Sequence, residues 1–256
     1  MPGTSRGRIR VGTSGWSYDH WRDVFYPPKT PSAKRLAYYA TRLSTVEINA
    51  SFYRTPSAHA VTVWKETAPA GFAYAVKGSR YITHFHKLDD VEDSLALFFD
   101  RIGGLGDTLE VVLWQLPEQL HIDVERLSGF LGQLPQRVRH AVEFRHESWL
   151  TPEVFETLRS HNVANVQIDS VQMPRNLTVT ADFVYVRFHG SSYHGEYTAP
   201  LLKPWTKFLA ENAAEGRGGY VYFNNDAGGH APVDAERLVG LLGEDAYPWP
   251  AATGAG

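Results

Sequence analysis

The sequence predicts a closed (β/α)8 TIM barrel built as a single domain over residues 1–256. Three observations support this fold. Short apolar runs typical of strands alternate with amphipathic helical segments, eight such strands can be placed, and 256 residues is a usual length for this barrel. An open doubly wound sheet is the alternative. We prefer the barrel because no strand is followed by the Gly-x-Gly-x-x-Gly turn that opens a phosphate-binding helix in that fold.

The first strand is expected at Arg8–Trp16, where Ile9 and Val11 alternate with polar residues until Gly12 and Gly15 break the pattern. The later strands are expected at Thr45–Phe52, Phe72–Ser79, Glu110–Leu116, His140–His146, Ala164–Ser170, Asp182–His189 and Gly219–Asn225. Helices are expected at Ser32–Leu43, with Ser32 as N-cap, and at Pro56–Thr67, Asp90–Ile102, Asp123–Leu134, Pro152–His161, Leu201–Glu215 and Asp234–Leu242. An irregular link replaces the helix between the sixth and seventh strands.

Composition narrows the class of protein. The net charge of -3 gives no reason to expect a polyanionic partner, although a local basic patch is compatible with it. The absence of cysteine excludes disulfides, thiolate nucleophiles and cysteine-ligated metals. No apolar run approaches the roughly 20 residues that cross a bilayer, so we expect a cytoplasmic protein without a membrane partner. Residues 1–7 and 246–256 are expected to be loosely ordered.

Nearly every expected strand carries polar side chains at its carboxyl end, where barrel enzymes place their active sites. Side-chain alternation puts Glu47 with Asn49, Glu143 with Arg145, Gln167 with Asp169, and Arg187 with His189 on one face of each strand. The residues between them, Ile48, Phe144, Ile168 and Phe188, are expected to pack against the helices. The polar faces should therefore converge inside the mouth of the barrel.

Buried charges must pair with one another or bind a ligand, because an unpaired buried ion costs several kcal/mol. An ion-pair network that only sets the register of the barrel is the structural alternative. The position of all these groups at one end favours a site, and the cations Lys77, Arg145 and Arg187 favour a ligand with phosphate or carboxylate groups. Cations among the carboxylates argue against a dedicated metal site. No cofactor is predicted, and a divalent metal is the alternative.

Candidate roles follow from residue chemistry. Glu47, Glu143, His189 and Asp169 are the candidate catalytic residues for acid–base chemistry. Candidate substrate-binding residues are Asn49, Lys77, Gln115, Arg145, Arg187, Asn224, Asn225, Asp226, Trp16 and Tyr53. Glu47 and Glu143 would suit glycoside hydrolysis only at a suitable separation. A rim with His84 and His86, together with aromatic residues interleaved with Arg54, Arg80 and Lys87, could stack on bases or sugar rings.

Seven stretches resemble the YecE-like family, a family of unknown function with a TIM-barrel fold. They are Gly12–Tyr18 with Trp21, Val46–Asn49 with Phe52 and Tyr53, Phe72–Lys77, Gln115–Pro117, Val142–Arg145, Val184–Gly190 and Tyr222–Asp226. The stretches cover nearly the whole chain in order, so the resemblance implies the barrel fold. It implies no reaction. The fold is similar to that of TIM-barrel superfamilies such as the sugar isomerases and a metal-dependent endonuclease. That similarity would imply phosphate-ester chemistry or DNA binding, but it is a fold analogy and does not establish function.

The function predicted first is binding or conversion of a small anionic polar substrate, phosphorylated or carboxylated, at the barrel mouth. If the protein is an enzyme, a hydrolase or lyase with Glu/His acid–base chemistry fits these residues. Nucleic-acid binding or phosphodiester processing is the second hypothesis, with nucleic acid as the second choice of partner. A non-catalytic ligand-binding module is the third. No oligomeric state is predicted.

Overall fold

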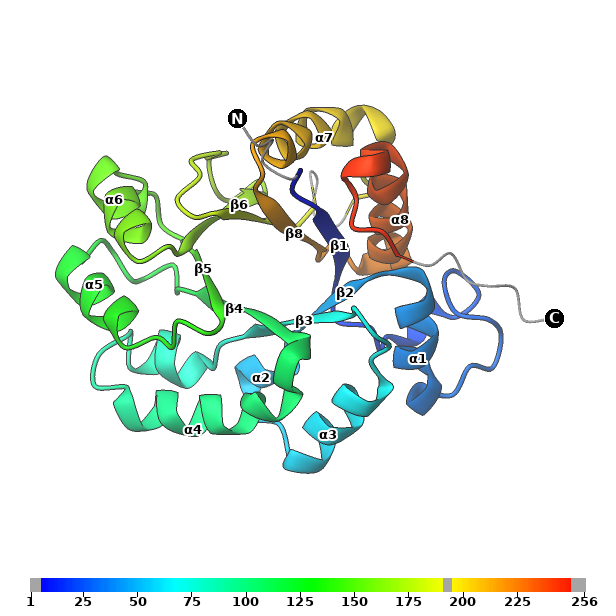
Figure 1. The fold of residues 1–256 in the computed structure, drawn as a ribbon, viewed down its shortest axis with the longest axis horizontal. Helices are drawn as coiled ribbons and strands as arrows, with labels where there is room; N and C mark the ends of the chain where they lie inside the picture. Colours follow the sequence, from blue (N-terminus) through cyan, green and yellow to red (C-terminus); the bar gives the residue numbers. More distant parts are fainter. Residues whose placement is uncertain (1–5, 191–194, 250–256) are drawn as a thin grey trace.

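Eight parallel strands close into a barrel in the computed structural model, which describes residues 6–190 and 195–249 (Figure 1). The strands are β1 (Ile9–Ser14), β2 (Thr45–Ile48), β3 (Ala73–Lys77), β4 (Leu109–Gln115), β5 (Arg139–Glu143), β6 (Ala164–Asp169), β7 (Phe183–Phe188) and β8 (Gly218–Phe223). Each strand pairs with the next along the chain, and β1 pairs with β8. The (β/α)8 barrel is confirmed.

The helices surround the barrel (Figure 1). They are α1 (Ser32–Arg42), α2 (Ala50–Tyr53), α3 (Ala58–Thr67), α4 (Glu92–Ile102), α5 (Val124–Gly132), α6 (Pro152–Ser160), α7 (Ala199–Ala214) and α8 (His230–Leu242). Short helical turns are η1 (Asp19–Trp21), η2 (Tyr81–Phe85), η3 (Gly103–Thr108), η4 (Glu147–Trp149), η5 (Ala227–Gly229) and η6 (Gly243–Asp245). No helix separates β6 from β7, as expected from the sequence.

Several element boundaries differ from the sequence prediction, and β5 ends at Glu143 rather than at His146. Strand β2 ends at Ile48 because the chain then turns into α2, where the Phe52 N–H donates to the Asn49 carbonyl at 3.1 Å. Helix α8 begins four residues before Asp234. Ser32 is the first residue of α1 rather than its N-cap, and the preceding residue makes no side-chain capping bond.

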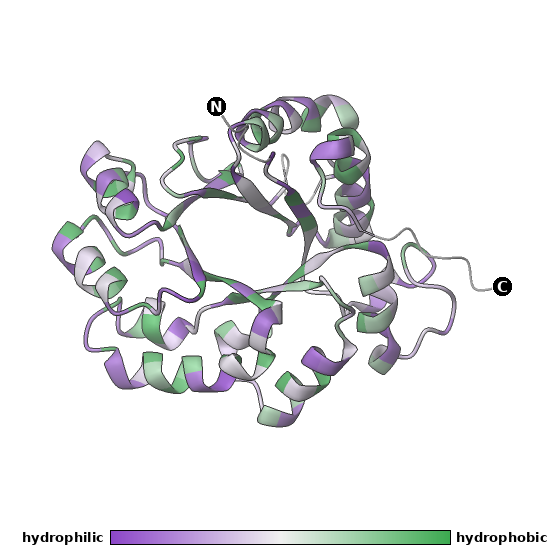
Figure 2. Cartoon of the chain, in the orientation of Figure 1, coloured by the Kyte–Doolittle hydropathy of each residue, from purple (hydrophilic) through white to green (hydrophobic). Residues whose placement is uncertain are grey.

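Hydrophobic side chains form two clusters, one between the strands and the helices and one inside the barrel. The helices carry both hydrophilic and hydrophobic residues, as amphipathic helices do (Figure 2). The inner cluster contains Val111, Leu113, Val166, Ile168 and Tyr185, among others. This packed interior separates the two ends of the barrel.

A polar network fills the amino-terminal end of the barrel. Arg10 pairs with Glu110 at 2.8 Å, and the Tyr220 hydroxyl donates to the other Glu110 oxygen at 2.7 Å. Arg139 donates to the same Tyr220 hydroxyl at 2.8 Å. These four side chains bond to one another, and Arg10 also donates to the Gly71 carbonyl at 2.8 Å. This end therefore has the character of a structural network and leaves the carboxyl end for a site.

His140 on β5 gives a prediction about acid stability. Its Nε2–H donates to the Pro135 carbonyl at 3.1 Å, and its Nδ1 accepts from the Trp114 indole at 3.3 Å. Burial lowers the pKa of His140 to about 4. Because the unfolded chain takes up this proton near pH 6.5, the neutral ring's contribution to stability is lost as the pH falls from 6.5 towards 4.

We therefore expect His140→Gln to lose less of its free energy of unfolding between pH 7 and pH 4.5 than the wild type loses. Urea unfolding at a series of pH values measures this, and His59→Gln, on an exposed helical residue, is the matched control. Equal pH dependence in His140→Gln and wild type would contradict the prediction.

The described residues that follow α8 and η6 pack against β1 and α1. The Tyr247 N–H donates to the Ile9 carbonyl at 2.7 Å, and the Trp249 indole donates to the Ala40 carbonyl at 2.9 Å. Residues 246–249 therefore differ from the loose end expected from composition, because backbone and indole donors find partners on β1 and α1. Residues 6 and 7 are also held, because Arg6 pairs with Asp245 and the Gly7 N–H donates to the Ala213 carbonyl at 2.8 Å. The rest of that expectation, for residues 1–5 and 250–256, lies outside the described residues. Within the described chain, no helix combines the length and apolar character needed to cross a membrane.

Candidate functional site

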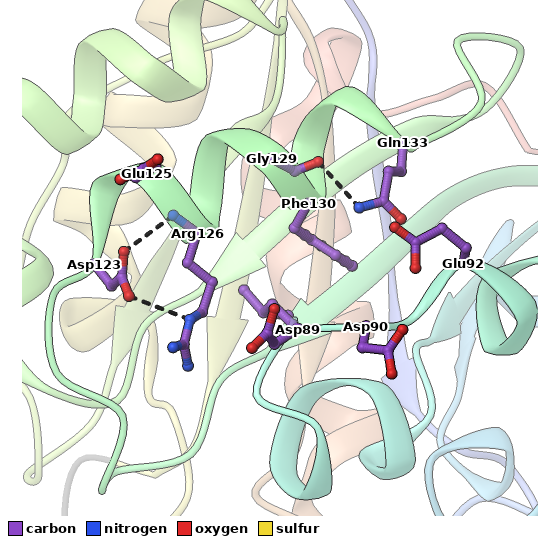
Figure 3. Close-up of a pocket in the computed structure, with 10 residues that line it drawn as sticks. Asp89, Asp90, Glu92, Asp123, Glu125, Arg126, Gly129, Phe130 and Gln133 are labelled. Carbon is purple, nitrogen blue, oxygen red and sulfur yellow. Dashed lines mark hydrogen bonds and ion pairs between the residues drawn. The ribbon is translucent and has the colours of Figure 1, made fainter.

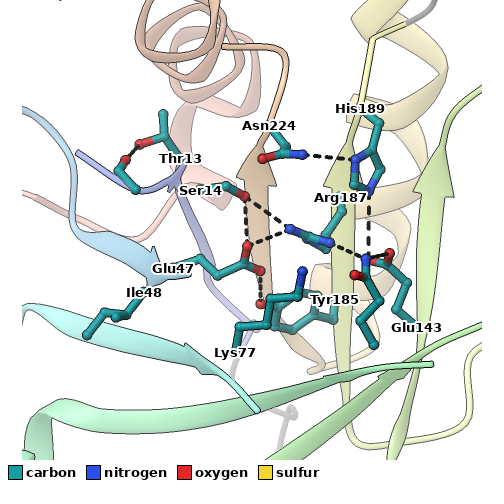
Figure 4. Close-up of polar contacts among 12 residues, drawn as sticks. Thr13, Ser14, Glu47, Ile48, Lys77, Glu143, Tyr185, Arg187, His189 and Asn224 are labelled. Carbon is teal, nitrogen blue, oxygen red and sulfur yellow. Dashed lines mark hydrogen bonds and ion pairs between the residues drawn. The ribbon is translucent and has the colours of Figure 1, made fainter. Parts of the chain in front are cut away.

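Arg187 joins two buried carboxylates at the carboxyl end of the barrel (Figure 4). It is the fifth residue of β7, and its Nη2 and Nη1 atoms each lie 2.7 Å from a carboxylate, that of Glu47 on β2 and that of Glu143 on β5. The Glu47 and Glu143 side chains are fully buried, and that of Arg187 is 1% exposed. Three strands that are distant in sequence are thus connected through one guanidinium group.

Each carboxylate has further partners. Glu47 accepts a hydrogen bond from Ser14 of β1 at 2.7 Å and one from the Tyr185 hydroxyl of β7 at 2.6 Å. Glu143 accepts from the Gln115 amide of β4 at 2.5 Å and from Arg145 at 2.5 Å. The carboxylate oxygens are therefore engaged by protein donors, which is what allows ionised groups to stay buried.

Burial and the neighbouring charges determine the protonation states of Glu143 and Tyr185. Burial alone would raise the pKa of Glu143, but Arg145 and Arg187 outweigh it and hold that pKa well below the usual range. Glu143 therefore stays ionised at neutral pH and is a poor proton donor. Burial and the nearby Glu47 carboxylate raise the pKa of the Tyr185 hydroxyl well above 10, so that group keeps its proton.

His189 lies beside this network at the end of β7. Its Nε2 is 3.8 Å from Glu143 and 3.3 Å from an Arg145 nitrogen, and its Nδ1 is 3.1 Å from the Asn224 amide nitrogen. Its side chain is only 12% exposed, and this burial lowers its pKa below 6.5. A neutral imidazole next to a carboxylate can accept a proton from a bound molecule.

Lys77, the last residue of β3, completes the group of charges. Its ammonium nitrogen lies 4.0 Å from the centre of the Phe52 ring, and the residue is 9% exposed. Figure 4 shows its side chain pointing towards the Glu47–Arg187–Glu143 chain. Burial, followed by the Arg187 charge, lowers the pKa of Lys77 to about 8.

A cavity of about 320 Å³ opens beside Arg145, whose side chain is 14% exposed. It is lined by His84, Gln115, Leu116, Pro117, Glu118, Gln119 and Arg145. Burial and the nearby Lys77 charge lower the pKa of His84 to about 4, so this wall carries a neutral imidazole at neutral pH. A hollow of this size suits a small molecule.

The inward placement predicted for β6 is wrong. Ile168 lies in the cluster inside the barrel, so Gln167 and Asp169 point outwards. Asp169 accepts hydrogen bonds from Trp205 of α7 at 2.7 Å and from Arg175 at 2.8 Å, and it takes no part in the Glu47–Arg187–Glu143 chain. The inner face of β6 is apolar. On its outer face, Asp169 bonds to α7 and to the irregular link, and the Gln167 amide nitrogen donates to the Thr178 carbonyl of that link at 3.1 Å.

Two of the three polar residues after β8 also lie away from the mouth network. Asn225 is fully buried and donates to Asp234 of α8 at 2.7 Å. Asp226 accepts from the Trp21 indole at 2.5 Å and lies 3.1 Å from His20. Alternation along β8 turns Asn224 towards the interior and Asn225 away from it, and Asp226 lies beyond the end of the strand, where η5 begins.

The remaining predicted residues surround the mouth. Asn49 follows β2 where α2 begins, and its side-chain oxygen is buried without a hydrogen-bond partner among the described residues. Trp16 is half-buried and packs edge-on against Trp64 at 5.8 Å. Tyr53 is 67% exposed, with the Arg80 guanidinium 5.4 Å from its ring centre. These side chains lie at the edge of the network and are not connected to it by hydrogen bonds in the described chain.

The family model for Protein of unknown function DUF72 matches residues 10–253. The chain belongs to the DUF72 family. It is 29% identical to the UPF0759 protein YunF of Bacillus subtilis (strain 168) over 273 residues, which cover 91% of this chain and 94% of YunF.

Solved DUF72 structures share the fold. A crystal structure of a DUF72 family protein from Thermotoga maritima MSB8 matches with a TM-score of 0.84 at 28% identity, covering 92% of this chain and 99% of that chain. One from Enterococcus faecalis V583 matches with a TM-score of 0.80 at 20% identity, covering 94% and 97%. The second likeness shows the fold alone. Neither match assigns a substrate to this DUF72 chain.

Two residues of the DUF72 site were missed by sequence reasoning. Ser14 of β1 and Tyr185 of β7 both bond to Glu47, and of these two strands only β7 had an inner face assigned from the sequence. Tyr185 is two residues before Arg187, so the alternation that predicts an inward Arg187 also predicts an inward Tyr185. The signal was present, but a tyrosine and a serine in a strand are easily taken for packing residues.

A second hollow of about 290 Å³ lies among the outer helices, between the segment before α4 and helix α5 (Figure 3). Its lining is rich in acidic side chains and comprises Leu88, Asp89, Asp90, Glu92, Asp123, Glu125, Arg126, Gly129, Phe130 and Gln133. Arg126 is already paired with Asp123 at 3.2 Å. In the part of the chain that the structure describes, no three His, Cys, Asp or Glu side chains are arranged to hold a metal ion.

Proposed function

We propose that the mouth of the barrel binds a small polar molecule with a phosphate or carboxylate group, as an enzyme or a ligand-binding protein. One observation carries the proposal. Three cations, Lys77, Arg145 and Arg187, surround two carboxylates, which leaves one formal positive charge in excess. Both carboxylates are already paired with arginine, so a bound anion is the group that would compensate Lys77.

The geometry supports a binding mode. Arg145 lines the 320 Å³ cavity, and it is the most exposed of the paired charges at the mouth, at 14%. Its guanidinium can keep its bond to Glu143 and still donate to an incoming anion, because an arginine has five N–H donors. Lys77 would then approach the same anion from the β3 side.

If the protein is an enzyme, His189 is the group best suited to proton transfer. It is neutral near pH 7, and Glu143 and Asn224 flank its two ring nitrogens. Glu143 would stabilise the imidazolium that forms when His189 takes a proton. A hydrolase or lyase acting on an anionic substrate is the reaction class that this arrangement serves. Membership of the YecE-like group within the family is the finer form of the assignment and adds no substrate.

The test is stabilisation by ligand. We expect inorganic phosphate, sulfate, citrate and glucose 6-phosphate, tested one at a time, to include at least one compound that raises the free energy of unfolding. The rise should be about 2.7 kcal/mol at a concentration 100 times Kd. Lys77→Met should remove the effect. Lys207→Met, which removes a lysine whose side chain is 78% exposed on α7, is the matched control and should retain it.

The outcomes separate the hypotheses. A flat response across the panel would overturn the anion site. Stabilisation by a single-stranded oligonucleotide alone, falling steeply with added salt, would favour the nucleic-acid alternative, for which the exposed Tyr53, Phe85 and Arg80 provide stacking groups. Binding of an anion that is recovered unchanged would favour the non-catalytic ligand-binding module.

A further inference from the structure

Lys77 is placed unlike the other two cations at the mouth. Arg145 and Arg187 each lie within 2.7 Å of a carboxylate oxygen, whereas no carboxylate of the described residues lies within 4.0 Å of the Lys77 ammonium. The ammonium lies over the face of the Phe52 ring, 4.0 Å from the ring centre. The amine is therefore enclosed at the end of β3 without a carboxylate in contact, and the more distant Glu143 and Glu47 charges offset only part of the effect of burial on its pKa.

The surroundings make the Lys77 amine easier to deprotonate in two ways. Burial opposes charge on the nitrogen, and the neighbouring Arg187 adds repulsion, so that the pKa of Lys77 falls to about 8. An amine that is desolvated and close to another cation is the arrangement by which proteins prepare lysine for attack on carbonyl carbon. Exposed lysines remain protonated well above neutral pH and react slowly for that reason.

We propose that Lys77 is a nucleophilic amine that forms an imine with the carbonyl group of a small anionic oxo compound, such as a 2-oxo acid or a ketose phosphate. The inference rests on the proposed anion site, since Arg145 and the cavity beside it would hold the anionic group while the carbonyl carbon faces Nζ. It adds a substrate class and a reacting atom to that site.

The step balances without an added oxidant or reductant. The Nζ lone pair attacks the carbonyl carbon, a C–N bond forms, and the carbonyl oxygen takes up a proton to give a carbinolamine. The hydroxyl group then leaves as water with a second proton, and the C=N bond forms. The nitrogen gives up both protons of its neutral NH2 group, so amine and carbonyl yield imine and one water molecule. His189, which is neutral and lies beside Glu143, is placed at the same mouth to exchange these protons.

The experiment is reductive trapping on the full wild-type chain. The protein is treated with sodium cyanoborohydride and either glyoxylate, an anionic carbonyl compound, or formaldehyde, a neutral one, and labelled lysines are quantified by peptide mass spectrometry. Lys207, whose side chain is 78% exposed, is the internal reference. We expect glyoxylate to label Lys77 at least about tenfold faster than Lys207 at pH 7.5, and formaldehyde to show a smaller preference.

Labelling of Lys77 by glyoxylate no faster than that of Lys207 would overturn the imine proposal, and the use of wild-type protein avoids dependence on a variant that fails to fold. Inorganic phosphate added as competitor tests the underlying site separately. If phosphate stabilises the protein but Lys77 is not labelled fast, the anion site is supported and the imine proposal is wrong. If Lys77 is labelled fast and no anion slows the labelling, Lys77 is reactive but the proposed anion site is wrong.

Discussion

Replacing Arg187 by methionine is expected to lower the free energy of unfolding by about 3–5 kcal/mol at pH 7. The change would leave Glu47 and Glu143 fully buried, each without the guanidinium nitrogen that now lies 2.7 Å away. Urea unfolding followed by fluorescence measures the loss. The reason is desolvation: a buried carboxylate whose charge is no longer compensated costs far more than the same group in water.

The pH dependence of stability gives a second test of the ion pair between Arg187 and Glu143. Arg145 and Arg187 lower the pKa of Glu143, so the stability it contributes in the wild type is present above about pH 4.5 and is lost as the pH falls below that value. Removing Arg187 takes away one of the two arginine charges that oppose burial, so the pKa of Glu143 rises. The deficit of Arg187→Met should therefore be largest at pH 7 and shrink towards pH 4.

Two further variants control this result. Adding Glu47→Gln and Glu143→Gln to Arg187→Met removes the uncompensated charges and should recover part of the lost stability. Lys207→Met breaks an exposed pair with Glu211 on α7, whose N–O distance is 3.8 Å, and should change stability by less than about 0.5 kcal/mol. A loss below about 1 kcal/mol in Arg187→Met would mean that the carboxylates are hydrated or protonated instead of paired.

Much of this architecture follows from the order of strands and helices. Alternation along β2, β5 and β7 identified Glu47, Glu143 and Arg187, because each lies between apolar residues that pack on the helices. The fold was predictable because every strand of a closed parallel barrel has one face towards helices and one towards the interior. Chain order then brings all the carboxyl ends to one side.

Strand β6 shows where such reasoning ends. The sequence of this strand alternates Gln167 and Asp169 with Val166 and Ile168, which fits either face pointing inwards. The interior there is filled by Val166 and Ile168 beside Tyr185, and the polar face finds donors on α7 and carbonyls in the irregular link. Only knowledge of those tertiary partners decides between the faces. The same limit applies to Asn225, whose partner Asp234 comes from α8.

Gly12→Ala is the second substitution for which we expect a large effect. Gly12 lies in β1 opposite Thr45 of β2 and Tyr222 of β8, and these two side chains touch each other at 2.8 Å through their hydroxyl groups. A methyl group at Gly12 would lie 2.0 Å from the Thr45 carbonyl oxygen and 2.9 Å from its carbonyl carbon. Backbone atoms cannot rotate away as a flexible side chain can.

In a closed barrel, β1 is held by strands on both sides, so relief of this contact must open one of the two seams. We expect Gly12→Ala to lower the free energy of unfolding by about 3 kcal/mol, at the upper end of the range for overpacked cores. Gly129→Ala is the control, because Gly129 is exposed on α5 with nothing within 4 Å of an added methyl group. That change should raise stability by about 0.5–1 kcal/mol.

The position of Gly12 also connects packing to the site. Its neighbour Thr45 lies two residues before Glu47 on β2, so a displaced β2 would move one carboxylate of the Glu47–Arg187–Glu143 chain. Gly12→Ala should therefore weaken anion binding as well as stability, whereas Gly129→Ala should leave binding unchanged. A stable Gly12→Ala with wild-type binding would show that the β1–β2 seam adjusts without moving Glu47, and the carboxylate would then owe its position to Arg187 and Tyr185 more than to its own strand.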